Sequence, residues 1–325
     1  MKREQILERL GFCVPDNRKK RVIVHADIAA EADDNFAVIH HLLSPSEDVR
    51  GIIAANFEWK FRQSTHPAMQ AQRLTSMEQS YEAGRRLLER MEIDDVPILK
   101  GASDFIEDRD RPPLSEGAEF MIREAMRECE EPLYIALQAG LTDLAAAYLT
   151  EPRIAERITA AIWIGGGAYP AGGEEPNLRQ DVYAAQVLFD SPVKIWQVPM
   201  NIYAGMNISL SEVISRVKPC GKVGAYIVDV MLKINEFYGQ IPLRMDFPHG
   251  ELWSIGDQPT VSVLLENAAG RRYHVIRAPH IRDDMTYEEN PDGKEIWVFD
   301  QIDRRLTMED FFAKLRLCYG GQSVV

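Results

Sequence analysis

Short apolar runs rich in β-branched residues recur along the chain, with longer amphipathic stretches between them. Runs of this kind, bounded by turn or charged residues, are typical of strands buried on both faces of a parallel sheet. The four clearest runs cover residues 21–24, 49–54, 133–137 and 160–164, and two later runs cover residues 193–198 and 273–276. The pattern therefore predicts a sheet built mainly from parallel strands.

The stretches between these runs have the period of helices that bury one face, and they are long enough to cross from one strand to the next. The predicted helices cover residues 35–43, 77–91, 116–129, 141–150, 209–217 and 224–237. Residues 58–72 and 277–294 have no clear period and are predicted to be surface loops. The alternation predicts an α/β fold with an open, mostly parallel (mixed) central sheet flanked by helices.

No linker rich in Gly, Ser or Pro divides the chain, and no internal repeat is visible. We therefore expect residues 1–325 to form a single domain, with residues 1–20 as an N-terminal helical extension. The N-terminal sequence is charged and lacks the apolar segment of a signal peptide. No run of 18 apolar residues offers a membrane span. We expect a cytoplasmic protein with no membrane partner.

Charge narrows the choice of ligand. The chain has 37 Lys and Arg against 50 Asp and Glu, a formal net charge of -13. This balance argues against a protein that binds the phosphate backbone of nucleic acid and favours a small neutral or cationic ligand. The four cysteines are widely scattered, so neither a zinc site nor a disulfide scaffold is indicated.

Acidic residues are concentrated directly after the first predicted strand. Residues 27–34 contain Asp27, Glu31, Asp33 and Asp34, and residues 22–35 contain no Lys or Arg. Carboxylates this close repel one another and raise each other's pKa unless a cation neutralises them. A hard divalent ion with oxygen ligands would do so, and Ca²⁺ best tolerates an irregular set of carboxylates.

A helix cap, an EF-hand and a phosphatase loop each fit this acidic segment less well. Asp33 and Asp34 would suit the N-terminus of the helix at 35–43, but one carboxylate is enough for a cap. An EF-hand would need a glycine and a distal glutamate that are missing. A phosphatase with an aspartyl nucleophile would need Asp two residues before Asp27, where His25 stands.

The acidic loop resembles a longer variant of the loop that characterises the nucleoside hydrolase family. Further segments that resemble the family follow in its order: residues 96–102, residues 136–143, residues 165–169, Glu175-Pro176-Asn177 with Asp181, and Gly256-Asp257. The resemblance covers roughly residues 21–265, and the ordered set is more specific than any single motif. It implies the Rossmann-like fold of that family and a homodimer or homotetramer.

Carried over position by position, the resemblance assigns roles to individual residues. Ca²⁺ would be held by Asp27, Asp34, the backbone carbonyl of Thr142, and Asp257. The ribose hydroxyls would be held by Asp33, Glu175 and Asn177, with Asn56 as a further contact. Glu31 receives no role.

The implied activity is hydrolysis of the N-glycosidic bond of a ribonucleoside, a small-molecule partner, to ribose and free base. Such a reaction develops positive charge on the sugar, consumes a water and needs the departing base to be stabilised. Asp27 is the candidate base that takes the proton from this water. The alternative is a calcium-dependent ribose- or nucleoside-binding protein without turnover.

The residues that assist the leaving base are the least defined. His249, Trp253 and Asp257 recur every four residues and would share one face of a helix. One hypothesis is that His249 protonates or hydrogen-bonds the base while Trp253 stacks on it; the other is that His249 lies in a loop and Trp253 in the core. The best-studied family members have His where this chain has Gly256.

For several more side chains a structural role is more common than a functional one. His40 and His41 are expected to lie at a solvated or packed helix edge rather than to bind a metal. Four aromatic residues are candidates for the wall of the base pocket, although an aromatic side chain more often belongs to the core: Phe57, Trp59, Tyr169 and Tyr203.

Overall fold

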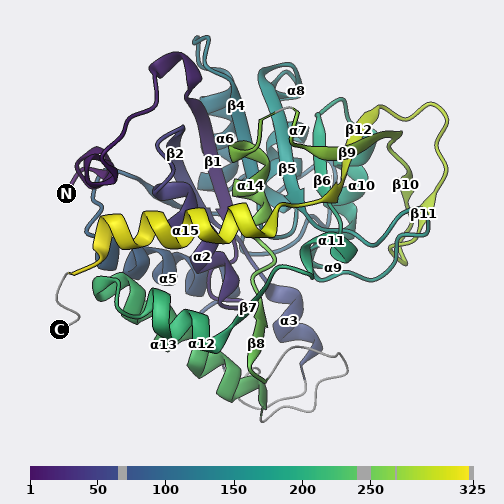
Figure 1. Cartoon of the computed structure of the whole chain (residues 1–325). Helices are drawn as coiled ribbons and strands as arrows, with labels where there is room; N and C mark the ends of the chain where they lie inside the picture. Colours follow the sequence, from purple (N-terminus) through teal and green to yellow (C-terminus); the bar gives the residue numbers. More distant parts are fainter. Residues whose placement is uncertain (65–71, 240–249, 268, 322–325) are drawn as a thin grey trace.

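Eight strands form the central sheet of the computed structural model, which describes residues 1–64, 72–239, 250–267 and 269–321. Their order is β3-β2-β1-β4-β5-β6-β12-β9, and β9 runs antiparallel to β12 while the other described pairs are parallel (Figure 1). The strands are β1 (Lys20–Ala26), β2 (Glu47–Ala54), β3 (Ile98–Lys100), β4 (Leu133–Leu137), β5 (Ile158–Ile164), β6 (Ile195–Val198), β9 (Arg272–Arg277) and β12 (Glu295–Gln301).

Both faces of this sheet are covered, because successive side chains of a strand point to opposite sides. In β1, Val22 and Val24 belong to one apolar core and Ile23 belongs to the other. The central strands can therefore be apolar at almost every position, which is the pattern that marked them in the sequence.

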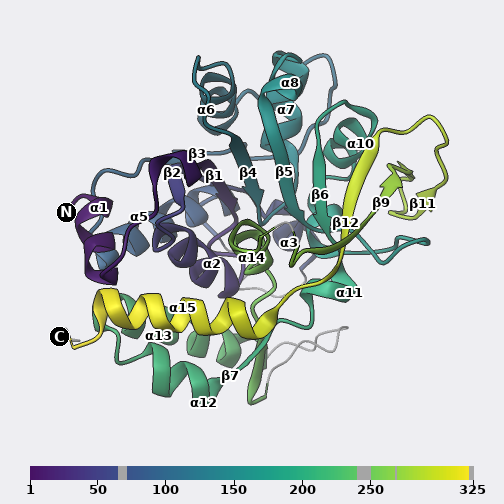
Figure 2. The same cartoon turned by 45° about the horizontal axis from the view of Figure 1, so that its top comes forward.

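Helices form a layer on each face, and Figure 2 shows α6, α7 and α10 on one side with α13 and α15 on the other. The first layer consists of α6 (Glu116–Ala125), α7 (Thr142–Thr150), α8 (Ile154–Arg157) and α10 (Val182–Asp190). The second consists of α2 (Asp33–Leu42), α5 (Ser76–Met91), α13 (Gly221–Gly239), α14 (Pro259–Leu265) and α15 (Arg304–Tyr319).

The strand order reverses between β1 and β4. Open α/β sheets have a crevice where the strand order reverses, outside the carboxyl ends of the strands. Ligands bind in this crevice. Asp27 directly follows β1, and Thr142 begins the helix that follows β4. Three short helices also follow strand ends at this edge: α3 (Glu58–Gln63), α9 (Pro176–Gln180) and α11 (Met200–Tyr203).

The remaining elements are short. Residues before β1 form α1 (Arg3–Leu7) and the 3₁₀ turns Glu8–Leu10 and Asp16–Arg18. Two small antiparallel pairs are β7 (Asn207–Ser209) with β8 (Leu252–Ser254), and β10 (His280–Ile281) with β11 (Tyr287–Glu288). Between β7 and α13 lie α12 (Leu210–Glu212) and a π-helical turn at Val213–Val217.

The expected α/β class with a mostly parallel mixed sheet is confirmed, and each of the six predicted strands overlaps a strand of the sheet. Two loop predictions were wrong in part. Residues 58–72 contain α3, and residues 277–294 contain β10 and β11. Neither β12 nor α15 was predicted from the sequence, although β12 pairs with β6 inside the sheet. The single domain over residues 1–325 stays a prediction.

Among the described residues, no helix combines the length and the apolar character that crossing a membrane requires.

Gly84 lets α5 pack closely on the sheet and on the acidic loop. A Cβ at Gly84 would overlap Cδ1 of Ile98 in β3 and lie 2.9 Å from Cδ1 of Ile28. We expect Gly84→Val to lower the free energy of unfolding by about 1–3 kcal/mol, as overpacking does. Urea denaturation measures this, with the exposed Arg86→Val on the same helix as the matched control. Equal effects of the two substitutions would contradict the close packing.

Candidate functional site

Three aspartates from two distant parts of the chain meet at the carboxyl edge of the sheet. Among the described residues, Asp33, Asp34 and Asp257 form a group in which one carboxylate oxygen of each lies within 4.8 Å of the others. Asp33 and Asp34 begin α2, and Asp257 lies between β8 and α14. The structure therefore completes the acidic loop with a residue from the C-terminal third of the chain.

Asp27 lies beside this group. It directly follows β1 and is 5% exposed, and its Oδ2 accepts a hydrogen bond from Nε2 of Gln180 at 3.1 Å. The negative charge of Asp27 helps to raise the pKa of both Asp34 and Asp257. Gln180 was not among the predicted site residues, because nothing in the sequence links the end of α9 to the end of β1.

Burial and mutual repulsion disfavour the charged form of these carboxyls. Burial is the main cause that raises the pKa of Asp27 to about 8 and that of Asp33 to about 7. Burial, followed by the neighbouring aspartates, raises the pKa of Asp34 and of Asp257 well above its ordinary value. A divalent cation would neutralise this charge.

The donor set fits such an ion. The three clustered carboxylates supply the hard oxygen ligands that Ca²⁺ prefers. Oδ1 of Asp34 is buried and has no hydrogen-bond partner among the described residues. A buried carboxylate oxygen without a donor is costly, and a metal ion would satisfy it. The group of Asp33, Asp34 and Asp257 could therefore hold a metal ion.

A lysine also reaches the acidic loop. Nζ of Lys60, on α3, lies 3.1 Å from Oε1 of Glu31 and donates to the carbonyl of Ala30 at 2.8 Å. Its charge lowers the pKa of Asp27 against the larger effect of burial. Glu31, to which the family pattern assigned no role, thus anchors Lys60 beside the aspartates. Sequence reasoning missed this pair because it placed Lys60 in a loop.

Glu175 and Asn177 follow the end of β5. Glu175 is fully buried, and its Oε2 accepts hydrogen bonds from the amides of Gly166 and Leu178, each at 2.8 Å. Its Oε1 accepts a hydrogen bond from the hydroxyl of Tyr203 at 2.5 Å. Nδ2 of Asn177 donates to the carbonyl of Ile164 at 2.9 Å.

Asn56 and Thr142 stand at two further strand ends. Nδ2 of Asn56 donates to the carbonyl of Ala102 at 3.1 Å, whereas its buried Oδ1 has no hydrogen-bond partner among the described residues. Thr142 is the first residue of α7, and its hydroxyl donates to Oδ2 of Asp181 at 2.8 Å. Helical geometry directs the carbonyl of Thr142 toward the amide four residues on, so this carbonyl is the least supported of the expected metal ligands.

His40 and His41 connect α2, which also carries Asp33 and Asp34, to the segment that carries Asp257. Both are fully buried; Nδ1 of His40 lies 2.7 Å from Oε1 of Gln258, and Nε2 of His41 lies 3.0 Å from Oγ1 of Thr260. The Thr260 hydroxyl also donates to the carbonyl of Asp257 at 2.8 Å. The two histidines therefore form a packed, unsolvated edge that holds residues 257–260 against α2.

The helical arrangement considered for His249, Trp253 and Asp257 was wrong. Trp253 lies in β8, where it pairs with Ile208 of β7, and it is fully buried in the apolar core of the α2 face. Trp253 does not share a helical face with Asp257. The geometry that suggested stacking of Trp253 on the departing base is therefore absent. His249 lies outside the described residues.

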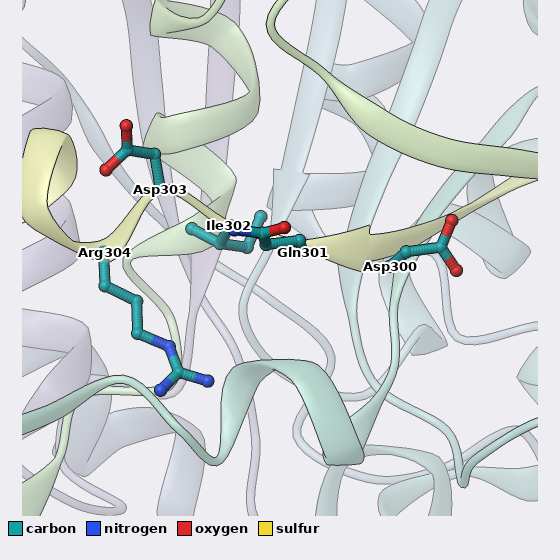
Figure 3. A pocket seen from close by; sticks show the side chains of 5 residues that line it. All are labelled: Asp300, Gln301, Ile302, Asp303 and Arg304. Atoms are coloured by element: carbon teal, nitrogen blue, oxygen red, sulfur yellow. The ribbon is translucent and has the colours of Figure 1, made fainter.

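Figure 3 shows a hollow lined by Asp300, Gln301, Ile302, Asp303 and Arg304, which include none of the clustered aspartates. It lies at the end of β12, which contains Asp300 and Gln301, and Arg304 begins α15. A Cβ at Gly205 would overlap the guanidinium of Arg304, so this side chain packs directly on the turn after Tyr203. The hollow therefore lies next to the turn that follows α11.

The chain matches one family model and several solved structures. The model of the inosine-uridine preferring nucleoside hydrolase family matches residues 22–305. Comparison with curated protein sequences finds no match.

The solved structures share the fold at low identity. A purine-preferring ribonucleoside hydrolase from Gardnerella vaginalis is 16% identical with a TM-score of 0.70, over 92% of this chain and 99% of that one. An inosine-uridine preferring nucleoside hydrolase from Bacillus anthracis is 15% identical with a TM-score of 0.60, over 91% and 99%. The type III effector XopQ, in complex with adenosine diphosphate ribose, is 12% identical with a TM-score of 0.64, over 98% of both chains.

Removing one carboxylate should weaken Ca²⁺ binding but raise the stability of the metal-free protein. In Asp34→Asn we expect Ca²⁺ affinity to fall at least about 100-fold, because a ligand and a charge are lost. In the presence of chelator the same variant should melt higher than the unsubstituted protein, because a buried amide is uncharged without having to bind a proton on folding. Isothermal titration calorimetry and thermal melts measure the two effects, with the exposed Asp292→Asn as control. Unchanged Ca²⁺ binding by Asp34→Asn would contradict the assignment.

The metal-free protein should lose stability as the pH rises. Asp27 and Asp33 hold their protons up to about pH 8 and 7 when folded, whereas an unfolded aspartate releases its proton near pH 4. The folded chain therefore binds more protons in this window, and the free energy of unfolding decreases as the pH rises through it. Melting in chelator should give a lower Tm at about pH 8.5 than at about pH 6, and Ca²⁺ should reduce the difference. A Tm that is constant or rises over this range would contradict the account.

Proposed function

Because the chain belongs to the inosine-uridine preferring nucleoside hydrolase family, we propose that it hydrolyses the N-glycosidic bond of a ribonucleoside to ribose and free base. The observation that carries this proposal is the meeting of Asp33, Asp34 and Asp257 beside the enclosed Asp27. The substrate is proposed to be a small-molecule nucleoside, and the resemblance supports a homodimer or homotetramer.

The aspartates would hold Ca²⁺, with Asp34 and Asp257 as the ligands on which the family pattern and the geometry agree. When bound, a divalent ion supplies charge that offsets the carboxylates and lowers the pKa of a water. Asp27 and the carbonyl of Thr142 are the further ligands that the family pattern proposes.

Asp27 is proposed as the base that takes a proton from the attacking water. Its enclosure supports this, as does the amide of Gln180, which donates to Oδ2 and fixes the orientation of the carboxylate. Negative charge around the sugar ring would stabilise the positive charge that develops as the bond breaks.

The ribose would be bound by Asp33, Glu175 and Asn177, with Asn56 as a further contact. Oδ1 of Asn56 is an acceptor without a partner among the described residues, so a ribose hydroxyl would satisfy it. Glu175 is held by two backbone amides and by Tyr203, which keeps its carboxylate in one orientation before the substrate arrives. Such preorganisation lowers the entropic cost of binding.

A second candidate function is calcium-dependent binding of a ribosyl compound without turnover. It is favoured by the likeness in fold to the effector XopQ, whose structure holds adenosine diphosphate ribose and matches 98% of this chain. Both candidates use the same aspartates and differ in whether Asp27 activates a water.

Assays of sugar release should distinguish the two functions. With a panel of purine, pyrimidine and modified ribonucleosides, we expect release of reducing sugar that requires Ca²⁺ and is abolished by a calcium chelator. Asp27→Asn should reduce kcat by about 10²–10⁴-fold, the usual contribution of a general base. Asp292→Asn is the control.

Failure of every nucleoside to release sugar, while ribose or adenosine diphosphate ribose still binds in the presence of Ca²⁺, would contradict the hydrolase and support the binding protein. Size-exclusion chromatography with light scattering measures the oligomeric state.

A further inference from the structure

Tyr203 connects the ribose side of the site to the metal side. It is the last residue of α11, in the segment that follows β6, and its hydroxyl donates to Oε1 of Glu175 at 2.5 Å. The phenol keeps its proton, because burial and the charge of Glu175 raise the pKa of Tyr203 well above its ordinary value. Glu175 therefore receives a donor from α11 in addition to its two backbone amides.

The ring of Tyr203 also fills the space beside Gly256. A Cβ at Gly256 would lie 2.8 Å from Cδ2 of Tyr203 and 3.6 Å from Oδ2 of Asp33. Contacts below 3.0 Å are not tolerated by real Cβ atoms, so a side chain at position 256 would require the ring to move. Gly256 precedes Asp257, and the best-studied family members have a histidine at this position. In this chain the ring of Tyr203, from α11, lies against this glycine.

Contacts at the start of α11 and in the turn after it hold the ring of Tyr203 in position. The amide of Met200, at the start of α11, donates to the carbonyl of Gly166 at 3.0 Å, and the amide of Gly166 donates to Oε2 of Glu175. Gly166 thus joins the base of α11 to the carboxylate that Tyr203 bonds at the other end. The guanidinium of Arg304, which Figure 3 labels, lies against Gly205 in the turn after Tyr203.

We propose that Tyr203 is a positioning residue for Glu175 and that the pair of Tyr203 and Gly256 determines which aglycone fits beside Asp257. The inference rests on the proposed function, since it assumes that Glu175 binds a ribose hydroxyl. Oε2 accepts two backbone amides and Oε1 accepts the Tyr203 hydroxyl, so the remaining acceptor capacity of Oε1 is what Glu175 can offer to a sugar hydroxyl. Loss of the hydroxyl leaves Oε1 a buried acceptor with one partner fewer, so that only the backbone contacts still orient the carboxylate.

The Tyr203→Phe substitution tests the positioning role, because it removes the hydroxyl and keeps the ring. We expect KM for the ribonucleoside to rise about tenfold with kcat changed less than about threefold, since ground state and transition state lose the same contact. The same substitution at Tyr273, on the edge strand β9, is the matched control.

A set of 2′-, 3′- and 5′-deoxynucleosides makes the test specific. If Tyr203 acts through Glu175 on one hydroxyl, the effect of Tyr203→Phe disappears for the substrate that lacks that hydroxyl and persists for the other two. A merely structural role would weaken all three to the same extent, and that result would overturn the positioning role.

The steric role is tested with Gly256→Ala, alone and combined with Tyr203→Ala. The single substitution should weaken kcat/KM for bulky aglycones by about tenfold or more, because the added methyl group meets the ring. In the Tyr203→Ala background the same methyl group should cost less than about threefold, because the space is open. Equal effects of Gly256→Ala in both backgrounds would overturn the steric pairing.

Binding of ribose in the presence of Ca²⁺, measured by calorimetry, separates this inference from the proposed function. If no nucleoside is hydrolysed but Tyr203→Phe still weakens ribose binding about tenfold, the hydrolase proposal fails and the positioning role stands. If nucleosides are hydrolysed and Tyr203→Phe changes neither KM nor ribose affinity, the positioning role fails and the hydrolase proposal stands.

Discussion

Four aspartates that repel one another are gathered at one edge of the sheet, and much of the surrounding structure holds them there. Asp27 directly follows β1, Asp33 and Asp34 begin α2, and Asp257 precedes α14. Their enclosure raises the pKa of each, which means that the folded chain stores electrostatic repulsion whenever they are charged. Proteins retain such clusters where a cation or a reaction requires them.

The compensating contacts come from several layers of the fold. His40 and His41 hold residues 257–260 against α2, so Asp257 cannot move away from Asp34 without breaking a buried hydrogen-bond network. Lys60 places a positive charge beside Glu31 of the acidic loop. Gln180 orients Asp27 from the side of β5. These contacts arise from elements far apart in the sequence and converge on one set of carboxylates.

Local chemistry was predictable from the sequence, whereas tertiary contacts were not. The apolar runs identified the buried strands because both faces of the sheet are covered, and Asp27, Asp33 and Asp34 were recognisable because they lie within eight residues. Asp257 and Glu175 could be found only through the family pattern. Lys60, Gln180 and the role of Tyr203 could not be found, since each reaches the site by a tertiary contact that leaves no local period or motif.

The helix expected through Trp253 is absent because residues 252–254 pair with β7 instead. The sequence around Gly256 also does not reveal that the ring of Tyr203, from another segment, lies against this glycine.

We propose that the aspartate cluster is a cation site that serves a ribosyl ligand. A crystal structure of the protein grown with Ca²⁺ and ribose, with anomalous diffraction recorded, tests this most directly. We predict an anomalous peak with carboxylate oxygens of Asp34 and Asp257 at about 2.3–2.6 Å, and the sugar between that peak and Glu175. A cluster without such a peak, with its carboxyls hydrogen-bonded to one another while ribose binds elsewhere, would contradict it.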